Sequence, residues 1–362
     1  MSVGGKCAGT LAAAAVAALA LSGCAPGHAT TGQVSVVASF YPLQFVAEQV
    51  GGPDVEVQSL TPAGAEPHDL ELTTRDVLTL ESAELVLTLS GFQPALDDAL
   101  AEIDGPQVVD TVAAEDDQLG EDGHLDEDDE DHEHDGASHD EASHDGASHE
   151  EDAHSAEEHE GHSHDEDEQG HSHDEDEHGH THAHDDGHGH TGTDPHFWLD
   201  PTRLAGVADQ VAAALSAIDP ENAETYAANA AELVGELTGL DEDFATALDS
   251  CSQHVIVVSH EAYGYLAARY GFDQVGIAGL DPENEPSPAR LQEIAQVIRT
   301  ENVSTIFTES LVNPHVAEAL AHELGITVQR LDPLETLTDP DADYLSVMRT
   351  NLTALTAALE CP

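Results

Sequence analysis

Residues 219–248 read DPENAETYAANAAELVGELTGLDEDFATAL, and this stretch decides the fold. Asp219 followed by Pro220 is a helix-start signal, because Asp caps free N–H groups and Pro fits the first turn. No further Pro follows as far as Leu248, and apolar residues recur at helical spacing. The stretch therefore predicts one helix of roughly 28 residues, about 42 Å long. A compact domain seldom needs such a helix, so we expect it to brace two lobes rigidly.

Short apolar runs alternate with helical segments on both sides of this helix. Alternation of strands and helices predicts an α/β fold with mainly parallel sheet. The predicted strands are 34–39, 55–60, 84–89 and 107–110 before the helix, then 254–258, 275–278, 304–308 and 327–331 after it. We therefore predict an N-terminal lobe over 34–219, a linker helix over 220–249 and a C-terminal lobe over 250–362.

The composition is extremely acidic. There are 74 Asp and Glu residues against 8 Lys and Arg, and the formal net charge is -66. This balance excludes a basic nucleic-acid-binding surface and favours a surface that attracts cations. Adaptation to a saline habitat would give a similar composition.

A histidine-rich and acidic segment lies in the predicted N-terminal lobe. Residues 115–190 hold 18 of the 25 histidines and 32 of the 74 acidic residues, with no Lys or Arg. The sequence GHSHDEDE occurs at 161–168 and again at 170–177. With so few apolar side chains, we predict a disordered loop over 115–193. Because imidazole and carboxylate groups bind divalent metals, we expect an accessory metal collector; an acidic spacer is the alternative.

Residues 1–24 resemble a bacterial lipoprotein signal peptide. Lys6 is followed by an apolar run at 8–21 that is too short for a comfortable membrane span, then by the lipobox-like LSGC ending at Cys24. We expect Cys24 to be lipidated and residues 25–33 to be a tether. The mature chain would then be anchored to the outer face of the cytoplasmic membrane. An ordinary secretory leader is the alternative.

Two further cysteines lie in the mature chain, namely Cys251 and Cys361. An even pair in an oxidising compartment predicts a disulfide. Neither cysteine has a CxxC partner, which argues against a metal site at this pair.

Three histidines lie on loops at the boundaries of predicted elements. His68 and His260 each follow a strand, and His196 precedes a helix. Ligands of parallel sheets lie beyond the carboxyl ends of the strands, and residues this far apart in sequence can converge only in a cleft between lobes. Three imidazoles and one oxygen ligand suit tetrahedral Zn²⁺. These positions therefore predict a metal site in the interlobe cleft.

Four motifs support a family resemblance: TPAGAEPHD at 61–69, DPHFWLDP at 194–201, VSHEAYGYL at 258–266 and IFTES at 306–310. In combination they resemble the zinc-binding, ZnuA-like lipoproteins of metal-ion ABC importers, a cluster that also contains manganese receptors. The resemblance covers nearly the whole chain after the leader. It implies two (β/α)₄-like lobes, capture of Zn²⁺ between them, and delivery to an ABC permease in the cytoplasmic membrane. We expect a monomer.

The resemblance implies that His68, His196 and His260 bind Zn²⁺. We expect Glu309 to be the fourth ligand, with Glu66 or a water molecule as alternatives.

Two positions favour zinc over manganese. Manganese receptors carry a carboxylate in place of the third histidine and an Asp shortly after the Glu-Ser motif. In this chain the third histidine is present as His260, and we assign Asn313 to the position of the Asp. Because Mn²⁺ prefers carboxylate ligands, both differences favour zinc. Asp69 is a candidate to orient a ligating imidazole, and Trp198 is expected to pack at the lobe interface.

A zinc-dependent hydrolase is the main rival function, because catalytic zinc also uses three protein ligands and an open position. The sequence contains no HExxH and no GxSxG motif, so we expect a protein that is not an enzyme. An extracellular metal buffer and a surface adhesin are further alternatives. One tight site beside several weak ones would favour a receptor over a buffer.

Overall fold

The computed structural model describes residues 32–114 and 194–362. The predicted leader with Cys24, most of the tether and the His/acid-rich segment 115–193 lie outside the described residues. None of the helices in the described ranges is both long and apolar enough to span a bilayer.

The first lobe contains a four-stranded parallel sheet in the order β2-β1-β3-β4. Its strands are β1 (Val34–Ala38), β2 (Val55–Ser59), β3 (Leu85–Thr88) and β4 (Gln107–Asp110). The connecting helices are α1 (Tyr41–Gly51), α2 (Thr74–Ser82) and α3 (Pro94–Glu102), with short 3₁₀ turns η1 (Gly52–Asp54) and η2 (Thr111–Ala114). Because all four strands run in parallel, their carboxyl ends lie at one edge of the sheet.

The second lobe repeats this arrangement with the order β6-β5-β7-β8. Its strands are β5 (Val255–Val258), β6 (Asp273–Gly276), β7 (Thr305–Thr308) and β8 (Thr327–Arg330). Its helices are α6 (Gly264–Tyr270), α7 (Pro288–Thr300), α8 (His315–Leu324) and α9 (Tyr344–Ala358). The two sheets have the same strand order, which confirms the predicted pair of parallel α/β lobes.

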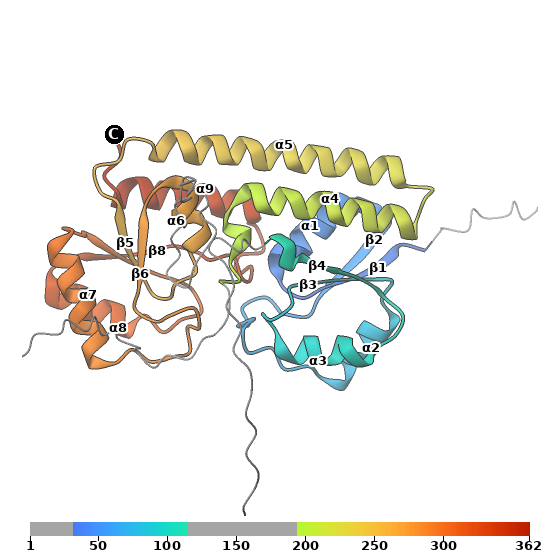
Figure 1. Cartoon of the computed structure of the whole chain (residues 1–362), viewed down its shortest axis with the longest axis horizontal. Helices are drawn as coiled ribbons and strands as arrows, with labels where there is room; N and C mark the ends of the chain where they lie inside the picture. Colours follow the sequence, from blue (N-terminus) through green and yellow to red (C-terminus); the bar gives the residue numbers. More distant parts are fainter. Residues whose placement is uncertain (1–31, 115–193) are drawn as a thin grey trace, which may run out of the picture. The chain divides into compact units, whose positions relative to one another are not determined.

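A long helix links the lobes. After the 3₁₀ turn η3 (Phe197–Leu199) and α4 (Pro201–Ile218), the chain forms α5 (Ala223–Leu248), which has 26 residues. Figure 1 shows α5 lying above α4, with α9 under its other end. The apolar side chains Leu237, Leu240 and Phe244 of α5 are buried in one core cluster with residues of both lobes.

Alternate residues of the central strands face opposite sides of each sheet. In β1, Val36 and Ala38 belong to the core shared with α1, α4 and α5, whereas Val37 packs on the side of α2 and α3. In the second lobe, Val258 of β5 lies in the shared core, and Val257 packs beneath α7 and α8. This alternation follows from the two-residue period of a strand.

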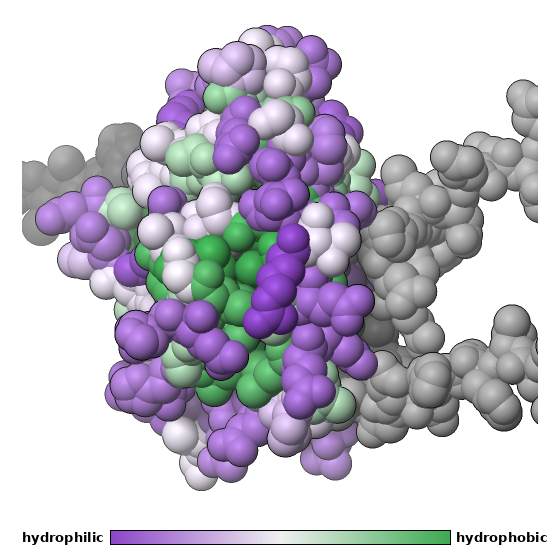
Figure 2. All heavy atoms as spheres, turned by 90° about the vertical axis from the view of Figure 1, so that its left-hand side faces the viewer, coloured by the Kyte–Doolittle hydropathy of each residue, from purple (hydrophilic) through white to green (hydrophobic). Residues whose placement is uncertain are grey.

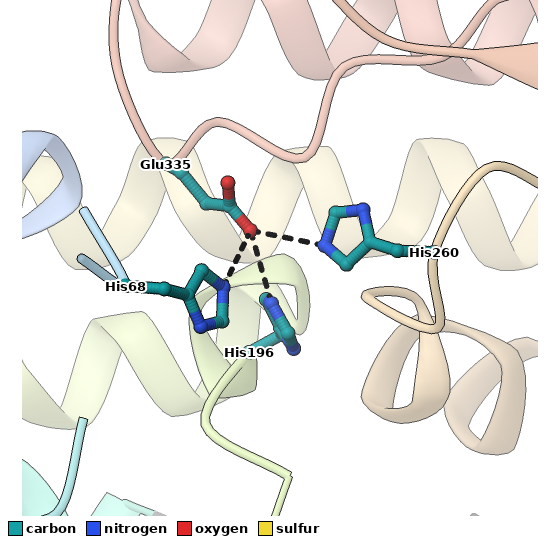
Figure 3. A group of neighbouring side chains, drawn as sticks. All are labelled: His68, His196, His260 and Glu335. Atoms are coloured by element: carbon teal, nitrogen blue, oxygen red, sulfur yellow. Dashed lines mark hydrogen bonds and ion pairs between the residues drawn. The ribbon is translucent and has the colours of Figure 1, made fainter. Parts of the chain in front are cut away.

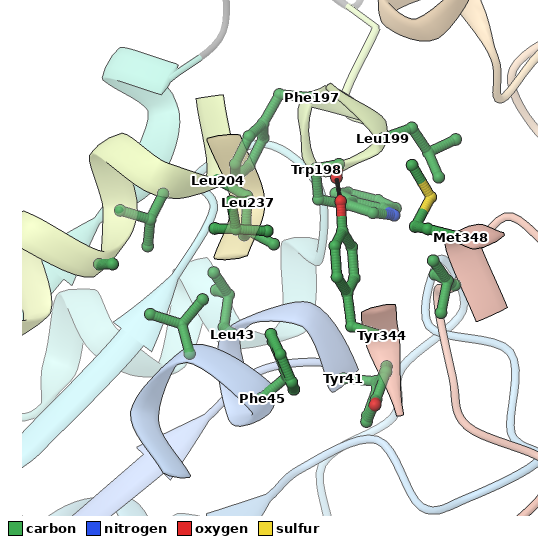
Figure 4. Packing of buried hydrophobic residues seen from close by; sticks show 14 of the residues in the cluster. Tyr41, Leu43, Phe45, Phe197, Trp198, Leu199, Leu204, Leu237, Tyr344 and Met348 are labelled. Carbon is green, nitrogen blue, oxygen red and sulfur yellow. Dashed lines mark hydrogen bonds between the residues drawn. The ribbon is translucent and has the colours of Figure 1, made fainter. Parts of the chain in front are cut away.

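The core is continuous between the lobes (Figure 4). The ring of Phe45 on α1 stacks on that of Tyr344 on α9, with centroids 5.3 Å apart. Tyr344 also donates a hydrogen bond of 2.6 Å to the carbonyl of Trp198. Trp198 is fully buried and donates from Nε1 to the carbonyl of Pro333 at 2.8 Å, which confirms its expected place at the interface.

Capping groups fix several helix starts. Asp200 accepts a hydrogen bond from the Thr202 N–H at the start of α4, and Thr73 forms a reciprocal capping box with Asp76 on α2. The predicted start of α5, at residue 220, is three residues early. The Asp219 carboxylate instead accepts from Asn222 and from the Tyr226 hydroxyl, so Pro220 lies in a turn before the helix.

A disulfide joins Cys251 to Cys361, whose Cα atoms are 3.9 Å apart. It ties the segment after α5 to the residues after α9. The bond closes a sequence separation of 110 residues.

The outer face of the second lobe is hollowed between α7 and α8. The groove has a volume of about 610 Å³ and its lining includes Leu291, Ala295, Val316 and Leu320, with Arg299 beside them. Figure 2 faces this side and shows hydrophobic residues surrounded by hydrophilic ones. The groove lies on the opposite face of the sheet from the shared core.

Candidate metal centre

Four loops bring four side chains to one point between the two sheets. His68 follows β2, His196 precedes η3, His260 follows β5, and Glu335 follows β8. One ligand atom from each lies within 4.8 Å of the others, and this is the group of metal-binding residues found in the described ranges. Figure 3 shows the three imidazoles turned toward one carboxylate oxygen. The strands thus place the site at the carboxyl-terminal edges of both sheets, as the rule for parallel sheets predicts.

The three rings surround Oε1 of Glu335 with their Nε2 atoms. The distances are 3.4 Å from His68, 3.0 Å from His196 and 3.1 Å from His260. Glu335, His196 and His260 are almost fully buried, whereas the side chain of His68 is 14% exposed. Solvent therefore reaches the group at His68.

Carboxylates hold the outer nitrogen of two of the rings. Nδ1 of His196 lies 2.7 Å from Asp194, and Nδ1 of His260 lies 2.7 Å from Glu309. Asp194 also accepts from the backbone N–H of His196 at 2.9 Å, which fixes the short Asp-Pro-His segment. A carboxylate oxygen only accepts, so each Nδ1 carries a hydrogen; when the ring is neutral, its Nε2 therefore has a lone pair available for a metal ion.

The carboxylate of Glu309 is itself held in place by a hydrogen bond. It accepts this bond from the hydroxyl of Ser259, the residue directly before His260. Both residues are buried.

The charges of the centre favour a cation. Burial lowers the pKa of His196 and His260, but their carboxylate neighbours outweigh it and raise both above the usual value. Burial likewise opposes ionisation of Glu335, yet the histidines hold its pKa well below its usual value. These directions mean that protons on the Nε2 atoms face Glu335 when no ion is bound. A divalent metal ion would replace these protons and carry the same sign of charge.

Glu66 lies beside the group rather than in it. Its carboxylate accepts a hydrogen bond of 3.2 Å from the backbone N–H of His68. Burial and the nearby charge of Glu335 raise the pKa of Glu66 to about 7. In this geometry Glu66 orients the backbone at His68.

The predicted fourth ligand, Glu309, has a different position from the one expected. The structure places it on the outer nitrogen of His260, and Glu335 supplies the oxygen at the centre. Glu309 directly follows β7, and so close to the end of the strand its carboxylate reaches Nδ1, the outer nitrogen of the His260 ring. The loop after β8 extends further and carries Glu335 to the front of the ring.

Two other predicted roles also differ from the structure. Asn313 is exposed before α8, where its side-chain oxygen accepts from the His315 N–H. The argument from Asn313 against manganese therefore does not hold, because Glu335 brings a carboxylate to the centre. Asp69 is exposed, and the carboxylates that orient imidazoles are Asp194 and Glu309.

Glu335 and Asp194 are residues of the centre that were not predicted from the sequence. The rule that ligands lie beyond strand ends also applies to the strand at 327–330, and it would have pointed to the LDPLE segment at 331–335. For Asp194 the available signal was its place two residues before His196.

Comparison with known proteins identifies a family that matches most of the chain. Residues 36–358 match the model of the ZnuA family, described as "Zinc-uptake complex component A periplasmic". The chain is 30% identical over 354 residues to the zinc-binding lipoprotein AdcA of Streptococcus pneumoniae serotype 4. That match covers 96% of this chain but 60% of AdcA, so the chain spans about three fifths of that relative's length.

Two solved structures show the same fold. The Zn(II)-bound ZnuA-like domain of Streptococcus pneumoniae AdcA superimposes with a TM-score of 0.63 and 26% identity, covering 91% of this chain and 100% of the domain. The laminin-binding protein Lmb of Streptococcus agalactiae, described as bifunctional with adhesin and metal-transporting activity, gives a TM-score of 0.66 and 26% identity. The match covers 90% of this chain and 99% of Lmb.

Proposed function

The chain belongs to the ZnuA family, whose members are binding components rather than enzymes, and on this premise we propose that it captures Zn²⁺ outside the cytoplasm and delivers it to an ABC permease. The cargo ion is bound by Nε2 of His68, His196 and His260 and by the carboxylate of Glu335. In this proposal the protein acts as a monomer, and the permease is its partner in the cytoplasmic membrane.

One observation carries the proposal: three imidazole nitrogens and one carboxylate oxygen converge within 4.8 Å in a buried space between two lobes. Three nitrogen ligands and one oxygen ligand form a tetrahedral set typical of Zn²⁺. Mn²⁺ prefers more oxygen ligands and a higher coordination number, so the three histidines favour zinc. Cu²⁺ would compete in vitro, because it binds nitrogen sites more tightly than Zn²⁺.

The rest of the chain has supporting roles in this proposal. Cys24 bears the lipid that holds the protein at the outer face of the membrane. Segment 115–193 binds Zn²⁺ weakly and raises its concentration near the tight site. Glu309 and Asp194 are not ligands here; they orient His260 and His196 and hold the hydrogen of each neutral ring on Nδ1.

Calorimetric titration with Zn²⁺ tests the assignment. We expect one tight site in the full chain and its loss in His68→Ala, His196→Ala, His260→Ala and Glu335→Ala. His315→Ala is the matched control, because the His315 side chain is 81% exposed on α8. Retention of tight binding in all four site variants would exclude this centre.

A deletion variant separates the receptor from a metal buffer. Removal of residues 115–193 should abolish weak sites and leave the tight one, because the four ligands lie outside that segment. Loss of the tight site on deletion would instead assign the main binding role to the segment.

A further inference from the structure

The loops that carry His68 and Glu335 are joined by one side chain. The Thr336 hydroxyl oxygen accepts a hydrogen bond of 2.9 Å from the backbone N–H of Gly64. The same hydroxyl donates to the carbonyl of Pro62 at 3.4 Å. Gly64 and Pro62 belong to the first lobe and Thr336 to the second, so this contact crosses between the lobes beside the metal centre.

Thr336 is presented by a loop that is fixed at successive residues. Asn351 on α9 accepts from the N–H of Asp332 at 3.0 Å and donates to its carbonyl at 2.7 Å. The indole of Trp198 binds the next carbonyl, that of Pro333. Leu334 has φ of +59°, a conformation that a non-glycine residue keeps only when its surroundings hold it. The Thr336 side chain is therefore a fixed acceptor at the edge of the centre.

The partner of Thr336 is an exposed turn. Residues 62–64 are exposed, and Gly64 has φ of +79°. The loop on either side of the turn is tied to its own lobe, because Gln93 donates to the carbonyl of Pro67 and Thr61 donates to that of Ser39. Thr336 ties the turn itself to the opposite lobe.

A path for an ion past His68 would lie between these two loops. His68 is the most accessible member of the four-residue group, its Nε2 lies 3.4 Å from Glu335, and the Gly64–Thr336 hydrogen bond joins the same two loops. Opening a path between His68 and Glu335 therefore breaks the Thr336 hydrogen bonds.

We propose that Thr336 is a positioning residue that latches the His68 loop to the Glu335 loop and slows the release of the bound ion. The inference rests on the proposed function, since it takes Zn²⁺ at the four-residue centre as the cargo. One hydrogen bond of ordinary net strength changes such a rate by about 2- to 10-fold.

The test measures zinc dissociation from the full chain after rapid mixing with excess chelator. Trp198 is the single tryptophan of the sequence, and its ring centroid lies 5.2 Å from that of His196, so its fluorescence gives a local readout. Thr336→Val removes the hydroxyl at nearly equal size, and Thr336→Ala is a second hydroxyl-free variant should valine strain the loop. Thr336→Ser keeps the hydroxyl. Thr353→Val is the control, because Thr353 is exposed and bonds within its own helix.

We expect release to be about 2- to 10-fold faster in Thr336→Val or Thr336→Ala, and close to wild type in Thr336→Ser and Thr353→Val. An unchanged rate without the hydroxyl overturns the latch, as does equal acceleration in Thr336→Ser or Thr353→Val. Absence of tight zinc binding by the wild-type chain would contradict the proposed function itself. The two failures are therefore distinguishable.

Discussion

Nδ1 of His260 lies 2.7 Å from a carboxylate oxygen of Glu309, while Nε2 of the same ring faces Glu335 at 3.1 Å. The ring is thus held between two carboxylates with different tasks. Glu309 fixes the hydrogen on the outer nitrogen, and Glu335 shares the inner position where a metal ion would bind.

Replacing Glu309 by Gln should weaken zinc binding without abolishing it. The amide can still occupy the space, but it no longer stabilises the required tautomer with a negative charge, and such losses typically cost about 10- to 100-fold in metal affinity. Competition with a zinc chelator measures the change. Glu318→Gln is the control, because Glu318 is 58% exposed on α8. Equal affinities of Glu309→Gln and wild type would contradict the assigned role.

Zinc affinity should fall as the pH is lowered, and the fall should begin above the ~6.5 of free imidazole. The ion binds only deprotonated rings, and the carboxylates around His196 and His260 raise the pKa of both despite their burial. Protons therefore compete at a higher pH than for a free histidine. Titrations between pH 8 and pH 5 would show the onset; constant affinity down to pH 5.5 would contradict the prediction.

Removal of the disulfide should destabilise the fold and spare the metal centre. Cys251 and Cys361 enclose a separation of 110 residues, for which a loss of about 2–4 kcal/mol is typical. The bond lies at the ends of α5 and α9, not in the loops that carry the ligands. Chemical denaturation of the Cys251→Ala/Cys361→Ala protein measures the loss. A large decrease in zinc affinity would show that the disulfide also shapes the centre.

An ion pair between Asp241 on α5 and Arg269 on α6 should make stability depend on pH. The Arg269 guanidinium donates to both carboxylate oxygens of Asp241, at 2.6 and 2.9 Å, and this lowers the pKa of Asp241. A depressed carboxyl pKa stabilises the fold above the unfolded-state value of ~3.9, and the effect is lost as the pH falls through the folded-state value. Asp241→Asn should therefore lower the unfolding free energy at pH 7 by about 1 kcal/mol, since Arg269 is partly exposed.

Measuring the same two proteins at lower pH completes this test. The difference between wild type and Asp241→Asn should shrink toward acid pH. Glu293→Gln, at an exposed position 3.9 Å from Arg290, should change stability little at either pH. A difference for Asp241→Asn that persists in acid would point to packing rather than charge.

Most of the fold could be predicted because its signals are local. The apolar runs at 34–39 and 55–60 and the Asp200-Pro201 start of α4 depend on residues close in sequence, and the structure has these elements within a residue or so. The strand predicted at 275–278 is β6 at 273–276 instead. The chain leaves α6 through Gly271 at φ of +76° and enters the sheet at once, pairing Asp273 with Val255.

The site was harder to predict because the role of each carboxylate depends on how far its loop carries it past the end of the strand. Sequence placed Glu309 and Glu335 on loops after neighbouring strands, but only the three-dimensional structure shows which carboxylate reaches the front of the His260 ring. Likewise, the opposite sides of His196 are contacted by Asp194 and Glu335, which are 141 residues apart. The separation of two residues along the chain does not predict such a contact.

The four converging side chains come from both sheets, and the outermost two, His68 and Glu335, are 267 residues apart. In a chain exported from its N-terminus, the first sheet ends at Asp110, but β8 and the loop that carries Glu335 lie in the last quarter of the sequence. Metal loading must therefore be a late event of maturation. An ion held by all four ligands would therefore stabilise the finished pair of lobes rather than the first lobe alone.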